Sequence, residues 1–240
     1  MNSEFILDIV IPVFNEGENI RKALDEIYLK IKTKNNVLII YDFKEDNTIP
    51  AVEKYVSDNS KKNIFLVMNK YGRGVLNAIK TGLEQVKNNA CLVCMGDLSD
   101  DLAVVDLMCE KITEGYDIVC GSRYMKGGRQ IGGPLLKGFL SRMAGRSLKF
   151  FTGIPTHDVS NSFKMYKKSV LENTAIESTG GFEIGLEILV KSFCSGGRVT
   201  EVPSIWKDRT GGKSNFKLWK WLPKYLKWYF YLLFCKKKKQ

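Results

Sequence analysis

The chain has 240 residues, 44% of them hydrophobic, which is enough for one large domain with a substantial core or for one domain plus an appendage. The net charge of +11 is unevenly distributed: residues 203–240 hold eleven Lys and Arg and one Asp, whereas residues 1–202 hold 26 basic and 25 acidic side chains. A nearly neutral body with a basic appendage argues against a protein whose body binds nucleic acid.

Short apolar runs alternate with amphipathic segments through the first half of the chain. Apolar runs bounded by polar residues are typical of strands buried in a parallel sheet, and their alternation with helices indicates βαβ units. We therefore predict an α/β fold with a mostly parallel sheet flanked by helices. Strands are expected at residues 7–13, 37–41, 64–68, 91–95 and 117–120, and helices at residues 20–31, after Pro50, at 75–86 and at 102–112.

The pattern changes after Arg123, where a glycine-rich loop at residues 126–134 interrupts the alternation. No repeat and no interdomain linker is recognisable in the chain. The elements expected after the loop are a helix at 135–151, a short strand within 159–166, helical stretches at 170–176 and 182–193, a last strand at 199–203 and a basic, glycine-containing loop at 209–214.

The cysteines and the N-terminus both favour a cytoplasmic protein. Cys91 and Cys94 lie inside an apolar strand and have no second Cys-x-x-Cys partner, so we expect no zinc site. Buried free thiols in a reducing cytoplasm are the simpler interpretation. The N-terminal Met-Asn-Ser-Glu is polar and leads directly into a strand, so we expect no secretory signal.

Residues 217–234 combine aromatic and apolar side chains with recurring lysines. The last continuous apolar run, residues 228–235, is far shorter than the ~20 residues that a membrane span needs. Lysines among Trp and Tyr are typical of a helix lying in the membrane interface, and residues 236–239 would add roughly 1 kcal/mol each on an anionic leaflet. The alternative is a helix packed on the body or on a partner subunit. We expect one domain over residues 1–215 and an interface helix with a basic tail over 216–240.

Three carboxylates follow the apolar run that begins at Cys91, namely Asp97, Asp100 and Asp101. Ligands of open α/β sheets sit just beyond the carboxyl ends of such strands, and carboxylates there suit Mg²⁺ or Mn²⁺ carrying a phosphate-bearing substrate. For Asp101 the start of the next helix is an equally good interpretation, because Asp is favoured at N-caps. Asp97 stands at the strand end itself, where capping is a poor explanation.

Other polar residues stand at the ends of the predicted parallel strands, which all face one edge of the sheet. They include carboxylates, a glycine loop and an arginine, but no Ser–His–acid set, and His157 is the only histidine of the sequence. Glu183 and Glu187, at helical spacing, either reach this edge or face solvent. The residues at the strand ends are Asn15, Glu16, Asp42, 69–74, Asp97 and Arg123.

Several short motifs, taken in their order and spacing, resemble those of inverting family 2 glycosyltransferases of the branch that includes dolichol-phosphate mannose synthase. The resemblance covers about residues 6–228, and it implies a GT-A type fold that binds a nucleotide-diphosphate sugar. The motifs lie at residues 11–16, 39–42, 46–48, 72–78, 121–128, 158–164, 201–203 and 209–214.

The resemblance also implies roles for individual residues. Asp97, Arg123 and Arg209 would be catalytic, and Asp97 and Asp100 would hold a divalent metal, Mg²⁺ or Mn²⁺. The acceptor phosphate would lie on Arg123, Arg142 and Ser162. The nucleotide sugar would contact Pro12, Asn15, Glu16, Asp42, Gly72, Gly74, Asn77, Asp97 and Lys213.

The chain departs from the family pattern at three positions. Met95 stands where the Asp-x-Asp metal motif has its first carboxylate, so a metal would depend on Asp97 and Asp100. Tyr41 replaces an acidic residue of the second-strand motif, which leaves base recognition to Asp42. Lys164 stands in place of an arginine, and a lysine does not make the bidentate contact of a guanidinium.

The resemblance implies transfer of a hexose from a nucleotide-diphosphate sugar, of GDP-mannose or UDP-glucose type, to a polyprenyl monophosphate at a membrane surface. The expected location is peripheral on the cytoplasmic face, and no nucleic-acid partner is expected. Two alternatives stay open: transfer to a soluble saccharide, and a non-catalytic membrane-peripheral protein on a degraded transferase fold. A nucleotidyltransferase is more distant, because residues 15–18 do not supply a basic, glycine-rich phosphate loop.

Overall fold

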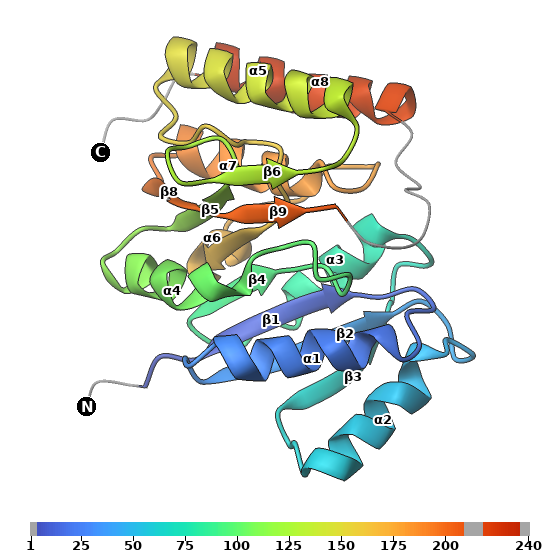
Figure 1. Ribbon diagram of the computed structural model, residues 1–240. Helices are drawn as coiled ribbons and strands as arrows, with labels where there is room; N and C mark the ends of the chain where they lie inside the picture. The colour runs from blue at the N-terminus through green and yellow to red at the C-terminus, as the bar shows by residue number, and fades with distance from the viewer. Residues whose placement is uncertain (1–3, 209–217, 236–240) are drawn as a thin grey trace.

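The computed structural model describes residues 4–208 and 218–235 (Figure 1). It contains a seven-stranded sheet flanked by helices and a separate two-stranded sheet. The strands of the main sheet are β1 (Leu7–Pro12), β2 (Asn35–Tyr41), β3 (Ile64–Met68), β4 (Ala90–Val93), β5 (Ile118–Ser122), β7 (Lys164–Lys167) and β8 (Val199–Pro203), and the small sheet pairs β6 (Arg129–Ile131) with β9 (Ile205–Lys207).

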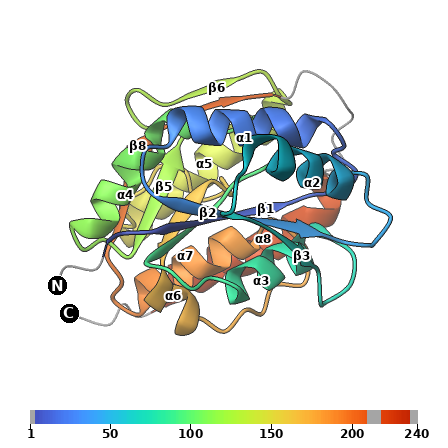
Figure 2. The same cartoon turned by 90° about the horizontal axis from the view of Figure 1, so that it is seen from below.

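The helices connect the strands and cover both faces of the main sheet (Figures 1 and 2). They are α1 (Asn19–Lys30), α2 (Thr48–Asn59), α3 (Val75–Glu84), the 3₁₀ turn η1 (Leu102–Val104), α4 (Val105–Thr113), α5 (Leu135–Thr152), α6 (Lys168–Glu172), α7 (Ile184–Cys194) and α8 (Leu218–Phe234). The apolar sides of α1, α2 and α4 pack on one face of the sheet, and those of α3 and α7 pack on the other.

The strand order is β3-β2-β1-β4-β7-β5-β8. β1 pairs in parallel with β2 and β4, β2 with β3, and β5 with β8, whereas β7 runs antiparallel between β4 and β5. The prediction of a mostly parallel α/β sheet is therefore confirmed. β1 shows why apolar runs form these strands: Ile9 and Ile11 point into one core and Val10 into the other, so no side of the strand meets water.

The second half of the chain differs from prediction in its short elements. The strand expected within residues 159–166 is the short β7, which begins only at Lys164. The glycine-rich loop contains β6, which pairs with the unpredicted β9. Three-residue strands on the surface carry too few side chains to show an alternating pattern. Pro50 lies in the first turn of α2, which begins two residues earlier at Thr48.

Helix α8 packs on α5 and α7, so the alternative of a helix packed on the body is found. Trp228 and Leu232 are buried, and the Trp228 Nε1–H donates a hydrogen bond to Ser178 Oγ at 3.1 Å. The Tyr229 hydroxyl donates to Ser147 Oγ of α5 at 2.9 Å. No helix among residues 4–208 and 218–235 is long and apolar enough to cross a membrane.

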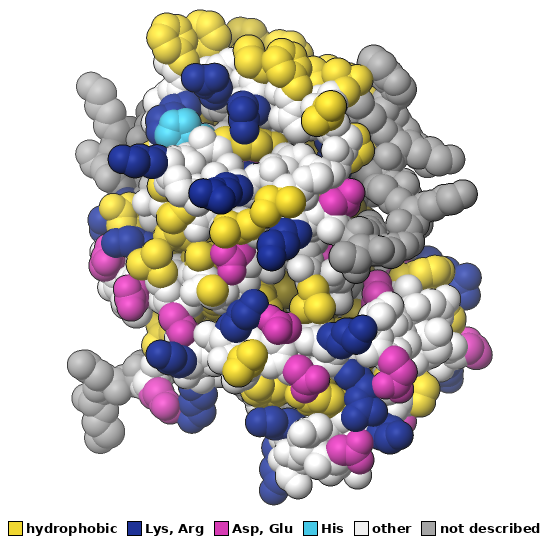
Figure 3. Space-filling view, in the orientation of Figure 1, with side chains coloured by type: hydrophobic (Ala, Val, Ile, Leu, Met, Phe, Trp, Pro, Cys, Tyr) yellow, Lys and Arg dark blue, Asp and Glu magenta, His cyan; other side chains and the backbone are white. Residues whose placement is uncertain are grey.

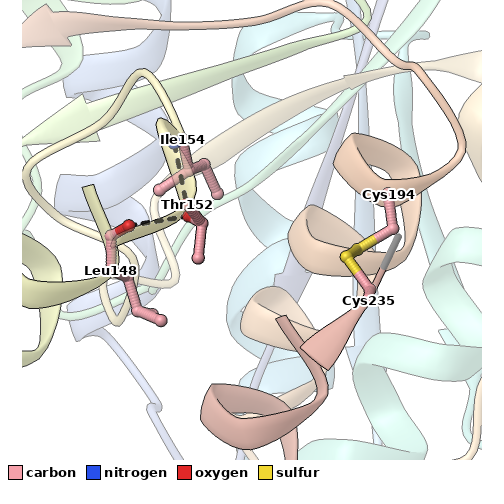
Figure 4. The surroundings of a disulfide bond; sticks show 5 residues. All are labelled: Leu148, Thr152, Ile154, Cys194 and Cys235. Atoms are coloured by element: carbon pink, nitrogen blue, oxygen red, sulfur yellow. Dashed lines mark hydrogen bonds between the residues drawn. A yellow bond between two sulfur atoms is a disulfide. The ribbon is translucent and has the colours of Figure 1, made fainter. Parts of the chain in front are cut away.

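The cysteines fall into two groups. Four are buried free thiols, as predicted for Cys91 and Cys94, and burial raises the pKa of each: Cys91, Cys94, Cys109 and Cys120. Cys194, the last residue of α7, forms an unpredicted disulfide with Cys235, which directly follows α8 (Figure 4). Two cysteines 41 positions apart give no local signal, since only the docking of α8 on α7 brings them together.

Replacing Cys235 by serine is expected to lower the free energy of unfolding of the oxidised protein by about 2–4 kcal/mol, because the disulfide no longer restricts the unfolded chain. Urea unfolding of the wild-type protein and the variant, with and without dithiothreitol, measures this difference. The reductant should remove the difference. Equal stabilities of the two proteins in oxidising buffer would contradict the prediction.

Candidate active site

The turn after β1 is held in place by the start of α2. Both carboxylate oxygens of the buried Asp46 accept hydrogen bonds from the Asn15 amide, at 3.1 and 3.2 Å, and Thr48 Oγ1 accepts one from the Glu16 amide at 3.0 Å. Asn15 has a positive φ of 53°, which Asn tolerates better than most residues. Asp46 thus shapes the turn that carries Asn15 and Glu16, while Pro12 ends β1 opposite Ile40.

Asp42, at the end of β2, fixes the glycine loop after β3. Its two carboxylate oxygens accept hydrogen bonds from Asn69 Nδ2 at 2.7 Å and from the Gly74 amide at 3.0 Å. Gly72 and Gly74 have φ values of 85° and 125°, and a Cβ at either position would meet nothing within 4 Å. The loop backbone therefore has a conformation that only glycine adopts without strain, and the space beside both glycines is open. Asn77 supports it by donating to the Tyr71 carbonyl at 2.9 Å.

Asp97 and Asp100 lie in the turn after β4. Asp97 Oδ1 accepts a hydrogen bond from the Ser99 amide at 3.1 Å. Among the described residues, Asp100 Oδ2 is buried and has no hydrogen-bond partner. Burial, followed by the negative charge of Asp97, raises the pKa of Asp100 to about 7. Asp101 caps the following 3₁₀ turn by accepting from the Ala103 amide at 3.1 Å, as the capping interpretation predicts.

The two carboxylates fit a hard divalent cation. An unpartnered buried oxygen beside a second carboxylate is costly unless a cation or proton neutralises it. The part of the chain that the structure describes holds no group of three or more His, Cys, Asp and Glu side chains arranged for a metal. A metal held here would take its remaining ligands from water and from a substrate's phosphate oxygens, as Mg²⁺ commonly does.

Replacing Asp100 by asparagine is expected to raise the free energy of unfolding at pH 8 by about 1–2 kcal/mol and to change it little at pH 4. The pKa of Asp100 is about 7 in the folded chain, against about 3.9 for an unfolded Asp. The folded state therefore holds a proton that the unfolded state has released, and wild-type stability falls as the pH rises through this window. Urea unfolding in buffer with a chelator, at both pH values, tests this, and a difference independent of pH would contradict it.

Arg123, just beyond β5, forms a buried bidentate ion pair with Asp158. Its Nε and Nη2 lie 2.7 and 2.9 Å from the two carboxylate oxygens, and its side chain is 10% exposed. Burial alone would raise the pKa of Asp158, but the charge and hydrogen bonds of Arg123 hold it below its usual range. Nη2 also donates to Ser141 Oγ of α5 and Ser160 Oγ, at 3.2 and 3.3 Å. These two hydroxyls were not predicted.

Tyr124 links this ion pair to Arg142 on α5. The Arg123 and Arg142 guanidinium carbons lie 4.8 and 5.1 Å from the centroid of the Tyr124 ring. Two arginines are thus gathered around one aromatic ring, and Arg142 is exposed. Ser162, predicted to join them, lines a small cavity with apolar side chains of α3 and α7.

A model of glycosyl transferase family 2 matches residues 8–174. The chain belongs to glycosyl transferase family 2. Among curated relatives, the dolichol-phosphate mannosyltransferase of Pyrococcus furiosus is 28% identical over 215 residues, which are 88% of this chain and 59% of that protein. The polyprenol monophosphomannose synthase of Mycolicibacterium smegmatis is 26% identical over 214 residues, 86% of this chain and 79% of that protein. The chain thus spans less than two thirds of the first relative.

Solved structures confirm the expected GT-A type glycosyltransferase fold for this family 2 member. Glucosyl-3-phosphoglycerate synthase from Mycobacterium tuberculosis, in complex with Mn²⁺, UDP and glucosyl-3-phosphoglycerate, superposes with a TM-score of 0.66 at 13% identity, covering 99% of this chain and 82% of that one. Mannosyltransferase PcManGT from Pyrobaculum calidifontis, in complex with GDP-mannose and Mn²⁺, gives a TM-score of 0.60 at 18% identity, covering 90% and 59%.

Three other polar side chains of this family 2 glycosyltransferase hold the fold together. Lys164 is fully buried, and its ammonium donates to the carbonyls of Val159 and Asn161. Burial lowers its pKa. His157 Nδ1 lies 2.5 Å from Glu201 Oε1, and the His157 amide donates to Glu201 Oε2 at 2.8 Å. The Lys164 ammonium and the His157 ring are therefore both engaged in contacts with neighbouring groups.

Of the two alternatives for Glu183 and Glu187, the one in which they face solvent is wrong. Both are buried and accept backbone hydrogen bonds from the loop before α7: Glu183 from the amides of residues 180 and 181, both at 2.6 Å, and Glu187 from those of residues 177 and 178, at 2.6 and 2.8 Å. Lys191 Nζ lies 2.7 Å from Glu187 and compensates its buried charge. Arg209, predicted to be catalytic, and Lys213, predicted to contact the nucleotide sugar, lie outside the described residues.

Proposed function

We propose that this family 2 glycosyltransferase transfers a hexose, namely mannose, from GDP-mannose to a polyprenyl monophosphate, with inversion at the sugar. The observation that carries the proposal is the proximity of two groups of charges. Asp100, beside Asp97, lies close enough to Arg123 and Asp158 for their charges to act on its pKa. A candidate cation site thus neighbours an arginine cluster suited to phosphate.

The donor is proposed to lie across the strand ends. The open loop at Gly72 and Gly74 and the turn at Asn15 and Glu16 would border its nucleotide, while Asp97 and Asp100 would hold a divalent metal. Bound there, the metal would neutralise the diphosphate and stabilise the departing charge. Arg209 and Lys213 are proposed to close over the phosphates.

The acceptor phosphate is proposed to bind at Arg123 and Arg142. Its oxygen forms a bond to the anomeric carbon while the bond from that carbon to the diphosphate oxygen breaks, and the nucleotide diphosphate leaves with the electron pair. The attacking oxygen is already anionic near neutral pH, so no strong general base is needed. This is consistent with His157 being engaged by Glu201. Arg123 is oriented for this role by Asp158, Ser141 and Ser160.

The relatives' names support the choice of mannose and polyprenol, since both denote transfer of mannose to a polyprenyl-type phosphate.

We propose that residues 1–215 form the catalytic domain and that residues 216–240 hold it on the cytoplasmic face of a membrane. The outer side of α8 exposes Phe230 and Phe234, which supports this role. The Cys194–Cys235 disulfide weighs against a reducing compartment. Titration of free thiols in protein isolated under alkylating conditions decides this, with four expected if the bond forms in the cell and six if it does not.

The test is release of free nucleotide diphosphate by the purified chain from a panel of GDP- and UDP-sugars. Each donor is offered with Mn²⁺ or Mg²⁺, with and without a short-chain polyprenyl phosphate in detergent. We expect release from GDP-mannose that requires the lipid phosphate and stops when a chelator is added. Release that a soluble saccharide supports as well would replace the acceptor. No release from any donor would favour a non-catalytic protein.

A further inference from the structure

Helices α5 and α8 expose one continuous set of large apolar side chains, which we call the α5–α8 face. Figure 3 shows hydrophobic side chains gathered along the upper edge of the molecule, over these helices. Phe139 and Phe150 of α5 are 61% and 83% exposed, and Phe234 of α8 is 80% exposed. The side chains that define the face are Leu136, Phe139 and Phe150 on α5 and Leu226, Phe230 and Phe234 on α8.

The side chains of the α5–α8 face are exposed even though both helices are packed against the rest of the protein. The opposite side of α8 buries Trp228 and Leu232 in the core, and the Tyr229–Ser147 hydrogen bond joins α8 to α5. The apolar positions 226, 230 and 234 lie four residues apart, which places them on one side of the helix. Positions 136, 139 and 150 likewise share one side of α5. Two helices that pack side by side thus present their apolar sides outward together.

The two segments of the chain that contain the face carry charges of one sign, although Glu177 and Glu201 from other segments lie 3.4 and 4.0 Å from Lys227 and Lys149. Residues 118–157 and 209–240, which include α5 and α8, contain 17 of the 37 Lys and Arg residues and none of the 26 Asp and Glu residues. The rest of the chain carries 20 basic and 26 acidic side chains. A second copy of this chain docked on the face would bring these like charges together, which is unfavourable in a low-dielectric contact. An anionic surface that accepts apolar side chains complements them.

We propose that the α5–α8 face docks on the surface of an anionic lipid bilayer, with α5 lying in the interface beside α8. A membrane contact made by the C-terminal segment alone would not include α5. The same helix carries Ser141 and Arg142 next to Arg123. Docking would therefore hold this arginine cluster within about one helix diameter, ~10 Å, of the lipid headgroups. Membrane docking itself does not depend on the proposed function. Only the identity of the phosphate that binds to the arginine cluster rests on it.

The test is sedimentation of the full chain with vesicles of phosphatidylcholine alone and of phosphatidylcholine with phosphatidylglycerol, at low and high salt. We compare the wild-type protein with the double variant Phe139→Glu/Phe150→Glu. The control is Leu29→Glu, which places one glutamate at a 76% exposed apolar position on α1, at the other end of the molecule (Figure 1), and so matches in charge the single variant Phe150→Glu. Circular dichroism verifies folding, and the single variant Phe150→Glu replaces the double variant if that one does not fold.

We expect the wild-type protein to bind the anionic vesicles more tightly than the neutral ones, and less tightly at high salt. The double variant should lose about ten- to a hundredfold in partition coefficient, because two aromatic side chains no longer enter the interface. Leu29→Glu should bind as the wild-type protein does. Wild-type binding that the double variant retains, or no wild-type binding, overturns the proposal.

Light scattering without vesicles tests the competing occupant of the face. A wild-type dimer that the double variant converts to monomer, with neither protein binding vesicles, would assign the face to a second copy and overturn the proposal. The vesicles contain no polyprenyl phosphate, and no sugar donor is added. Vesicle binding without hexose transfer in the release assay would therefore leave this inference standing while the proposed function fails, and transfer without vesicle binding would do the reverse.

Discussion

Asp97→Asn should lower the rate of nucleotide diphosphate release by about a hundred- to a thousandfold. Asp97 and Asp100 are the two carboxylates that the turn after β4 brings together, and the family's first metal carboxylate is replaced here by Met95. A metal that loses one of two protein carboxylates is held by the other alone. The measurement is the initial rate of GDP release from GDP-mannose in the presence of polyprenyl phosphate.

The concentration of Mn²⁺ distinguishes loss of a metal ligand from general damage to the site. In Asp97→Asn, a higher Mn²⁺ concentration should be needed for half-maximal rate, because the remaining carboxylate binds the ion more weakly. Asp101→Asn is the matched control: Asp101 is four residues away and caps η1, and asparagine caps equally well. Comparable losses in both variants would contradict the assignment of Asp97 to the metal.

Asp158→Asn should destabilise the protein by about 3–5 kcal/mol, because it leaves the guanidinium of Arg123 buried without its counter-charge. The side chains of Asp158 and Arg123 are 0% and 10% exposed, so water cannot replace the lost carboxylate. Urea unfolding at pH 7 measures the change. A loss below about 1 kcal/mol, the value typical of exposed ion pairs, would show that the pair is solvated.

The pH dependence of stability gives a second measurement on the same pair. The pKa of Asp158 is lowered in the folded protein, so the stability that it contributes is present above the ordinary Asp pKa and is lost as the pH falls through the folded value. Asp158→Asn should therefore flatten the acid side of the stability profile. Glu4→Gln is the control, since Glu4 and Lys34 form an ion pair with side chains 65% and 59% exposed, and it should leave that profile unchanged.

The sequence predicted the edge of the sheet at which the polar residues of the candidate site gather. Parallel strands all end at the same edge, so the polar residues that follow β1, β2, β4 and β5 had to meet there. The structure joins the strand-end residues in this way: Asp42 holds the loop of Gly72 and Gly74, and the charge of Arg123 reaches Asp100. Periodicity and family motifs were sufficient because both are local properties of the chain.

The groups that position these residues could not be predicted in the same way. Arg123 contacts Ser141, Asp158 and Ser160, which are 18, 35 and 37 positions away in the chain. Asp46 holds the turn at Asn15 from 31 positions away in the chain. Such contacts depend on how loops from different strands pack, and no spacing within one segment reports that.

The sequence by itself determined the α/β class, the approximate bounds of the longer strands and helices, the carboxylates and arginine at the sheet edge, and the apolar, lysine-rich character of the C-terminal helix. These properties depend on hydrophobic period and composition within single segments. Only the tertiary structure decided that Glu183 and Glu187 are buried, that Cys194 joins Cys235, and that α8 lies beside α5. The reason is that a helix shows which of its sides is apolar, whereas the element that covers that side is chosen by the packing of the whole chain.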